Sequence, residues 1–227
     1  MPLSDPELAR FSRQLLLPGM GGLAQERLRA ARIRVVGGGP IAGPALLYLA
    51  AAGVGTLYLD DAADVAPEDA AGWLYPPDRA GEARVTAALE ALKAASGFAR
   101  ARIHATGAEP TAALVCAGGR LAREAAESAR LAGILHAVAE GDEDGGAVVV
   151  VPPGAPCYSC AHRVGTGVAP PAPTAAALGA LAAAELVLAI SGALSPPQGR
   201  RIDLGRGEPR SRPTTRLPGC ACGAGQA

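Results

Sequence analysis

A glycine turn and two pairs of cysteines have residue types and spacings suited to chemistry. Residues 37–42 read Gly-Gly-Gly-Pro-Ile-Ala, a G-x-G-x-x-A form of the dinucleotide-binding fingerprint, and the acids Asp60 and Asp61 follow about twenty residues later. Glycines let the backbone approach a phosphate, and a carboxylate accepts hydrogen bonds from ribose hydroxyls. The pattern predicts nucleotide contacts at Gly37, Gly39, Ala42 and Asp61. An NAD site and an empty structural turn remain open alternatives.

The cysteine pairs are Cys157 with Cys160 and Cys220 with Cys222. Four thiolates suit a closed tetrahedral zinc site, which would attach the C-terminal segment to the rest of the chain. The second pair has one spacer residue where two are usual, and His162 is an alternative ligand. The pairs therefore predict structural zinc, with four unligated thiols as the alternative.

The elements that carry these residues follow an α/β pattern. Ile33–Val36, Ile41–Ala52 and Thr56–Leu59 read as strand, helix and strand, which is one unit of a parallel sheet. A long helix is expected over Gly81–Ser96, and the four successive valines before Pro152 indicate a strand buried on both faces. Further strands are expected at Arg102–Ala105, Ala113–Cys116, Ile134–Ala137 and Ala147–Val151, with short strand-like pieces around Ile202 and Thr214.

The predicted fold class is therefore α/β and Rossmann-like, with a mostly parallel sheet, flanking helices, N-terminal helices and a zinc-clipped C-terminal segment. We expect one domain over residues 1–227. Its parts are an N-terminal helical arm (1–31), a nucleotide-binding-type core (32–151) and a zinc-pair and C-terminal segment (152–227).

Charge and hydropathy restrict the partners. Twenty-one basic and twenty-one acidic residues cancel, so no overall field attracts nucleic acid or an anionic membrane. Thr174–Leu194 is the most apolar segment, but Glu185 interrupts it, which favours a buried alanine-rich helix over a membrane span. The first ten residues contain two acids and no apolar stretch. We therefore expect a cytoplasmic protein, in which thiols serve metal binding more than disulfides.

Several motifs together resemble one known family. Residues 10–14 (Arg-Phe-Ser-Arg-Gln), 16–18 and Gln25 are similar to the opening of ThiF, MoeB and HesA proteins of the ubiquitin-activating-enzyme-like superfamily. Residues 44–56 are similar to their nucleotide-binding helix and second strand, and the cysteine pairs to their zinc pairs. The resemblance implies a dimer that binds Mg-ATP and adenylates the C-terminal glycine of a ubiquitin-like sulfur carrier or modifier.

The same resemblance exposes departures at the implied ATP site. The family's S-N-L-x-R-Q stretch corresponds to Glu68–Trp73, which places Gly72 where a phosphate-binding arginine is expected, and the chain contains no asparagine. Arg84 stands where the family has a lysine, and the metal-binding aspartate falls near Gly118. The sequence therefore predicts a degenerate ATP site in a non-catalytic or dimer-partner subunit. An active adenylyltransferase with a rearranged site, in which Asp60, Asp61 or Asp64 alone holds the metal, is the alternative.

Arg13 is retained. The resemblance implies that this arginine reaches from one protomer into the ATP site of the partner, so the chain is expected to form a homodimer or a heterodimer with an active paralogue. Arg10 and Arg13 forming ordinary surface ion pairs is the other interpretation. For the whole chain, a remoter interpretation is a dinucleotide-binding protein whose ligand has changed. Cys116 is the only thiol outside the pairs, and we expect it to be a small buried hydrophobe.

Overall fold

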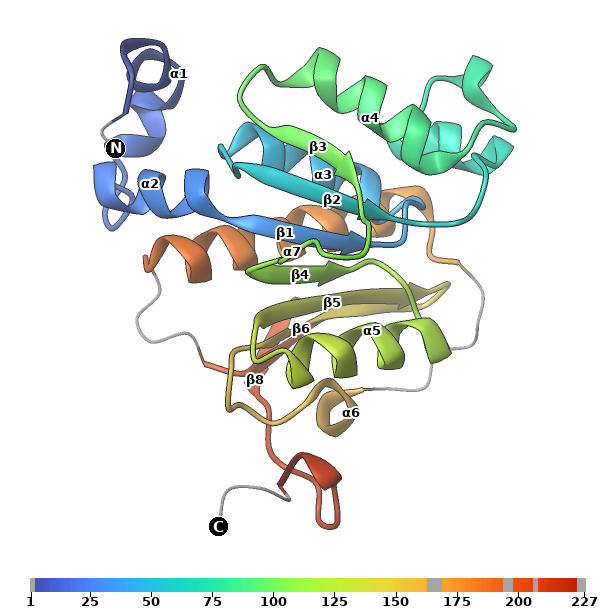
Figure 1. Cartoon of the computed structure of the whole chain (residues 1–227). Coiled ribbons are helices and arrows are strands. Elements are labelled where there is room, and N and C mark those ends of the chain that lie inside the picture. The colour runs from blue at the N-terminus through green and yellow to red at the C-terminus, as the bar shows by residue number, and fades with distance from the viewer. Residues whose placement is uncertain (1–2, 163–168, 194–197, 206–207, 224–227) are drawn as a thin grey trace.

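The computed structural model describes residues 3–162, 169–193, 198–205 and 208–223, except for the side chains of residues 70–72 and 223. Its described strands form one eight-stranded sheet in the order β3-β2-β1-β4-β5-β6-β7-β8 (Figure 1). The strand bounds are β1 Arg32–Val36, β2 Thr56–Asp60, β3 Arg100–Ile103, β4 Ala112–Val115, β5 Leu135–Asp142, β6 Gly145–Val151, β7 Arg200–Leu204 and β8 Arg210–Pro213.

The sheet changes direction at β5. Strands β3, β2, β1, β4 and β5 pair in parallel, whereas β6, β7 and β8 pair antiparallel. The four valines of β6 are at most 2% exposed, which confirms the prediction of a strand buried on both faces. The α/β, Rossmann-like class with a mostly parallel sheet is likewise confirmed.

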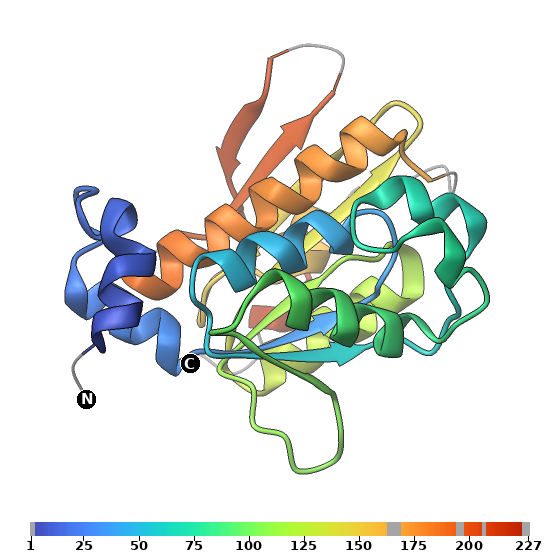
Figure 2. The ribbon, with the colours of Figure 1, turned by 90° about the horizontal axis from the view of Figure 1, so that it is seen from above.

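Helices cover the two faces of the sheet unequally. On one face α3 (Ala42–Ala51), α4 (Arg84–Ala95) and α7 (Ala172–Ser191) lie side by side (Figure 2). The other face carries α5 (Gly119–Leu131) over β4 and β5, and the short α6 (Tyr158–Ala161) against β6. The larger hydrophobic core lies under α3, α4 and α7, and the smaller under α5 and α6.

The N-terminal arm consists of α1 (Asp5–Leu15) and α2 (Gly22–Ala30). The Ser4 backbone N–H donates to Glu7 Oε2 at 2.8 Å, closing the first turn of α1 as a capping box does. Buried Phe11 packs against Phe98 in a tilted arrangement, with ring centroids 5.7 Å apart. These contacts hold the arm at the end of the molecule where β1 begins (Figure 1).

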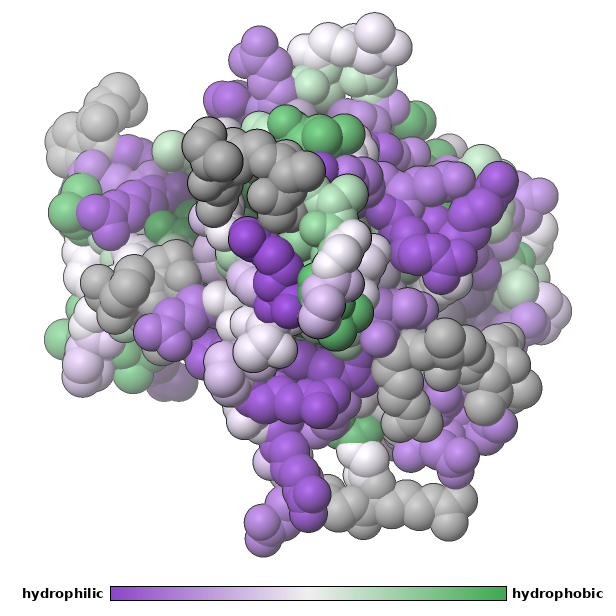
Figure 3. All heavy atoms as spheres, turned by 90° about the horizontal axis from the view of Figure 1, so that it is seen from below, coloured by the Kyte–Doolittle hydropathy of each residue, from purple (hydrophilic) through white to green (hydrophobic). Residues whose placement is uncertain are grey.

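Helix α7 has the length and composition of a membrane span, but 44% of its apolar window is buried within the fold. Its Glu185 pairs with Arg200 of β7. Both features fit the core helix that the sequence predicts. On the face shown in Figure 3, hydrophilic residues dominate and hydrophobic ones form only small separate patches among the described residues.

Some element predictions were incomplete. Helix α5 was not expected, and β5 extends five residues beyond Ala137, to Asp142, because it pairs with β6 along its whole length. Strand β3 begins and ends two residues earlier than predicted, since its register is set by pairing with β2. Strands β7 and β8 also continue the same sheet beyond residue 151.

Candidate functional site

The glycine turn joins the carboxyl end of β1 to α3. Gly37 has a φ of +88°, and a Cβ built on it would lie 2.6 Å from the carbonyl oxygen of Cys116. This position therefore requires glycine both for its conformation and for its close approach to the end of β4. Ala42 opens α3, and its N–H donates to the Gly39 carbonyl at 2.9 Å. The predicted residues thus lie in the strand–turn–helix arrangement that the fingerprint needs.

Asp61 and Arg84, the other predicted nucleotide residues, lie against this turn. Asp61 Oδ2 accepts the Gly38 N–H at 2.5 Å and lies 3.3 Å from Arg84 Nη1. The Tyr75 hydroxyl donates to the Gly38 carbonyl at 2.8 Å. The N–H and the carbonyl of Gly38, in the middle of the turn, are therefore both bonded to side chains of the chain itself.

Asp69 completes this arrangement from the 3-10 helix η1 (Pro67–Gly72). It is only 1% exposed. Its Oδ2 accepts from Arg84 Nε at 2.8 Å and from the Ala66 N–H at 2.8 Å, and lies 2.7 Å from Arg84 Nη2. We call Asp61, Asp69, Tyr75 and Arg84 the closing cluster.

The closing cluster carries a net negative charge. Two carboxylates surround one guanidinium. Burial alone would lower the pKa of Arg84, but the hydrogen bond and charge of Asp69, with the charge of Asp61, raise it. Burial also raises the pKa of Tyr75, which keeps its hydroxyl a donor. The crevice that Gly38, Tyr75 and Arg84 line has a volume of about 10 Å³, roughly the space of one water.

A larger pocket of about 580 Å³ lies beside the turn, over the carboxyl end of β4 and the β5–β6 hairpin. Ile41 lines it next to the turn, and Gly118 and Gly119 line it at the start of α5. The loop from β4 to α5 thus contributes glycine and alanine here but no carboxylate, as the sequence predicted at Gly118.

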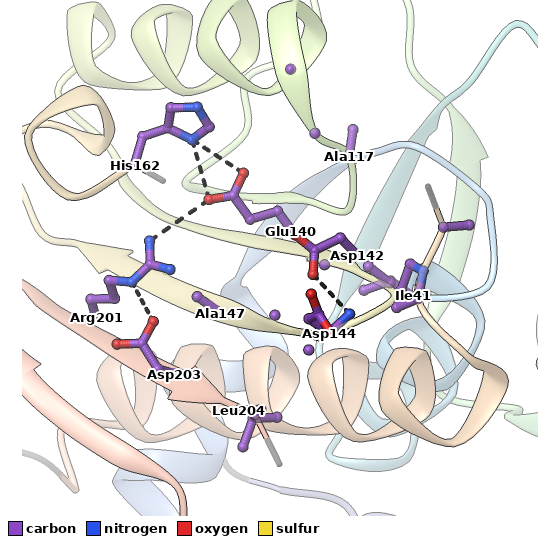
Figure 4. Close-up of a pocket in the computed structure, with 18 of the residues that line it drawn as sticks. Ile41, Ala117, Glu140, Asp142, Asp144, Ala147, His162, Arg201, Asp203 and Leu204 are labelled. Carbon is purple, nitrogen blue, oxygen red and sulfur yellow. Dashed lines mark hydrogen bonds and ion pairs between the residues drawn. The ribbon is translucent and has the colours of Figure 1, made fainter. Parts of the chain in front are cut away.

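Glu140 is the centre of a polar cluster in this pocket (Figure 4). Its Oε2 accepts from the Tyr158 hydroxyl at 2.6 Å, and its carboxylate lies 3.2 Å from His162 Nδ1 and 3.9 Å from Arg201. Arg201 also donates to Asp203 at 2.6 Å. Burial, followed by the hydrogen bond to Glu140, raises the pKa of Tyr158. The His162 ring is thereby oriented toward Glu140, and His162 does not belong to the cluster formed by the four cysteines.

The cysteine pairs converge. The Sγ atoms of Cys157, Cys160, Cys220 and Cys222 all lie within 4.8 Å of one another. The sulfur–sulfur distances are 3.8 Å for Cys157–Cys160, 3.6 Å for Cys157–Cys220 and 3.6 Å for Cys160–Cys222.

These distances fit a tetrahedral metal. Zinc–sulfur bonds of about 2.3 Å at tetrahedral angles separate the sulfurs by about 3.8 Å. The Leu217 N–H donates to Cys160 Sγ at 3.4 Å. A backbone hydrogen bond from Cys157 lowers the pKa of Cys222 to about 6, whereas burial raises the pKa of Cys160 and raises that of Cys157 to about 12. A bound metal would have to hold all four sulfurs as thiolates. The shortened Cys220–Cys222 spacing therefore does not keep either sulfur out of the cluster.

Arg13 lies far from the glycine turn of its own chain. It is exposed on α1, at the end of the molecule where β1 begins, whereas the turn follows the other end of β1 (Figure 1). Neither Arg13 nor Arg10 makes a salt bridge within the described residues, so the ion-pair interpretation has no support there. Any contact between Arg13 and a glycine turn must be made with a second chain.

The Tyr75 contact and the Glu140 cluster were not predicted from the sequence. Tyr75 joins the turn from a segment whose pattern gives no sign of it, and the Glu140 cluster forms only when β5, α6 and β7 meet. Asp69 lies in the stretch that the resemblance aligns with the family's phosphate-binding motif, where the added acids Glu68 and Asp69 were expected to repel a triphosphate, but its pairing with Arg84 was not predicted. Cys116 is 8% exposed, and burial raises its pKa to about 12, in agreement with the predicted buried hydrophobe.

Part of the sequence is similar to known proteins. Residues 11–116 match the ThiF family. The probable adenylyltransferase/sulfurtransferase MoeZ of Mycobacterium tuberculosis is 38% identical over 104 residues, which cover 45% of this chain and 26% of that protein. Protein HesA, heterocyst, of Trichormus variabilis is 44% identical over 93 residues, covering 40% of this chain and 35% of that protein. The matched part therefore spans about a quarter to a third of these relatives.

The fold also resembles solved structures along almost its whole length. A crystal structure of E. coli MccB with ATP has a TM-score of 0.81 at 20% identity, covering 94% of this chain and 74% of the other. A structure of PaaA has a TM-score of 0.71 at 20% identity, covering 95% of this chain and 76% of the other. At this identity the likeness establishes the fold alone.

Proposed function

We propose that this chain, which belongs to the ThiF/MoeB/HesA family, has a degenerate ATP site and acts as a non-catalytic dimer partner. The partner is either a second copy or an active paralogue. The assembly would act on a ubiquitin-like sulfur carrier or modifier, and it would be located in the cytoplasm.

The observation that carries the proposal is the closing cluster. In adenylation, catalysis rests on cations and backbone donors that stabilise phosphate charge. Here the Gly38 N–H is bonded to Asp61, and Arg84 is held by Asp61 and Asp69. A triphosphate at this turn would displace a carboxylate from a backbone donor and would meet a net negative cluster.

The exposed Arg13 supports the dimer part of the proposal. An arginine supplied by one chain to the phosphates of another stabilises charge without a competent site of its own. Because Arg13 is remote from the chain's own turn and makes no salt bridge within the described part of the chain, its guanidinium is available for that role.

The pocket beside the turn supports a role in holding a carrier tail. Its lining combines glycine backbone with the side chains of Glu140, His162 and Arg201, so an extended peptide would find both donors and acceptors. MccB, which has a similar fold, has been crystallised with MccA, and we propose that this pocket likewise binds a partner, here an extended carrier tail.

The four cysteines would hold zinc as a structural ion. They leave no open coordination position, so the metal would link the segment after β6 to the C-terminal segment and would take no part in group transfer.

One observation favours the alternative of an active adenylyltransferase with a rearranged site. The large pocket and the glycine turn adjoin at Ile41, so a nucleotide and a carrier tail would meet there if the closing cluster opened. Isothermal calorimetry with Mg-ATP, on protein of measured zinc content, separates the two. We expect no heat at millimolar ATP. Micromolar binding followed by ATP–pyrophosphate exchange would overturn the proposal.

A further inference from the structure

The two carboxylate oxygens of Asp69 have unequal surroundings. Oδ2 is within hydrogen-bonding distance of Arg84 Nε, Arg84 Nη2 and the Ala66 N–H. Oδ1 is buried and has no hydrogen-bond partner among the described residues. An unpaired buried carboxylate oxygen is costly, and a native fold retains few of them.

This unpaired oxygen lies beside Gly39 of the glycine turn. A Cβ built on Gly39 would lie 3.9 Å from Asp69 Oδ1 and 4.0 Å from Arg84 Nη1, and no heavy atom of the described chain outside the neighbouring residues is closer. Gly39 lies three residues before α3 begins at Ala42, near the helix N-terminus that favours an anion. An anion bound at Gly39 would thus lie about as close to Asp69 Oδ1 as to Arg84.

We propose that Asp69 is the specificity-determining residue of the glycine turn, and that it excludes phosphate by aiming a bare carboxylate oxygen at Gly39 while it neutralises Arg84. The inference rests on the proposed function and goes further, because it assigns the main part of the loss of phosphate binding to one side chain of the closing cluster. Asp61 has a different role, since its oxygens accept the N–H groups of Gly38 and Ala63.

Replacing the Asp69 carboxylate by an amide changes the group at the position of Oδ1. In Asp69→Asn, the amide oxygen can keep the hydrogen bonds from Ala66 and Arg84, while the amide NH₂ takes the place of Oδ1. The group facing Gly39 then changes from acceptor to donor. Arg84 keeps only Asp61 as a counter-charge, so the cluster changes from net negative to neutral.

Glu68 provides a matched control. It is the neighbouring acid on the same 3-10 helix, and it is exposed. Glu68→Gln removes the same charge from the same segment but leaves Asp69 Oδ1 and Arg84 unchanged.

The test measures binding of Mg-ATP and of inorganic tripolyphosphate by calorimetry to the wild-type chain, Asp69→Asn and Glu68→Gln, with thermal unfolding as the folding check. We expect at least tenfold tighter binding of both ligands to Asp69→Asn than to the other two proteins. Adding Arg84→Met to Asp69→Asn should abolish the gain. If Asp69→Asn does not fold, Asp69→Ser, which also removes Oδ1, takes its place.

The outcomes separate this inference from the proposed function. A folded Asp69 variant that binds no better than Glu68→Gln overturns the inference and leaves the proposed function standing. An equal gain in both variants also overturns it, because bulk charge would then be the cause. Micromolar ATP binding by the wild-type chain overturns both.

Discussion

Arg84 binds a single oxygen of Asp69 through two of its nitrogens, Nε at 2.8 Å and Nη2 at 2.7 Å, while its third nitrogen lies 3.3 Å from Asp61. The only guanidinium of the closing cluster is therefore committed to carboxylates of its own chain. The pairing connects α4 to the segment that follows β2, so the arrangement that we propose excludes a phosphate also fixes the loop over the glycine turn.

Replacement of Arg84 by methionine is expected to destabilise the fold by about 3 kcal/mol, because Asp69 would remain as a buried charge without its partner. Urea denaturation measures this loss. Arg120→Met is the matched control, since Arg120 pairs with Glu124 at 3.5 Å on the surface of α5 and such pairs contribute at most about 1 kcal/mol. Equal losses in the two variants would show that the Asp69 pair is not structurally important.

Replacement of Cys222 by serine is expected to remove most of the bound zinc and to expose the C-terminal segment to protease. Cys222 Sγ lies 3.6 Å from Cys160 Sγ in the four-thiol cluster, and a structural zinc site that loses a thiolate binds its metal much more weakly. Zinc content by mass spectrometry and limited proteolysis report the two effects. Cys116→Ser, the same change outside the cluster, should keep its zinc. Wild-type levels of zinc in Cys222→Ser would mean that Cys222 is not a ligand.

Local spacing predicted the glycine turn and the cysteine cluster because their geometry is set within a few residues. The closing cluster could not be predicted in this way. It forms because the segment after β2 folds back between β2 and α4, which brings Tyr75 to Gly38 and Asp69 to Arg84. Tyr75 and Gly38 are 37 positions apart in the sequence, and Asp69 and Arg84 are 15 positions apart. Hydrophobic periodicity does not predict contacts of this kind.

Helix α5 was missed for a different reason. Its buried side consists of Ala122, Ala125, Ala126 and Ala129, which are spaced as on one helix face. In a chain so rich in alanine, however, this spacing does not stand out from the background. The antiparallel pairing of β6 with β5 depends on the turn between them, so β5 was predicted from its composition but its extension to Asp142 was not.

Stability is expected to fall as the pH drops below about 6.5, in part because of His136. Burial lowers the pKa of this side chain, with the charge of Arg130 acting in the same direction and the Ile134 carbonyl and Glu127 acting against them. The unfolded chain then takes up the proton at higher pH than the folded chain does. The contribution of His136 is therefore fully present above its ordinary pKa of 6.5 and is lost as the pH falls toward the lower folded value.

Urea denaturation between pH 7.5 and 5 measures this dependence. In His136→Leu the loss of unfolding free energy over that range should be smaller than in the wild-type chain, whereas the difference between the two proteins should be constant above pH 7. Parallel curves over the whole range would rule out His136 as a contributor.

Replacement of Arg13 by alanine is expected to leave the chain folded but to impair an active family member assembled with it. The side chain is exposed on α1 and makes no salt bridge within the described residues, so its loss should shift the thermal midpoint very little. Its proposed contact is with the phosphates bound by the other chain, and removal of an arginine from such a site costs a factor of about 10³ or more in rate. Co-expression with a competent paralogue, followed by ATP–pyrophosphate exchange, measures the effect. Arg10→Ala, one helical turn away on the same exposed surface, controls for disruption of the arm. If the partner retained full activity beside Arg13→Ala, the arginine would have no role across the interface, and the dimer proposal would lose its chemical basis.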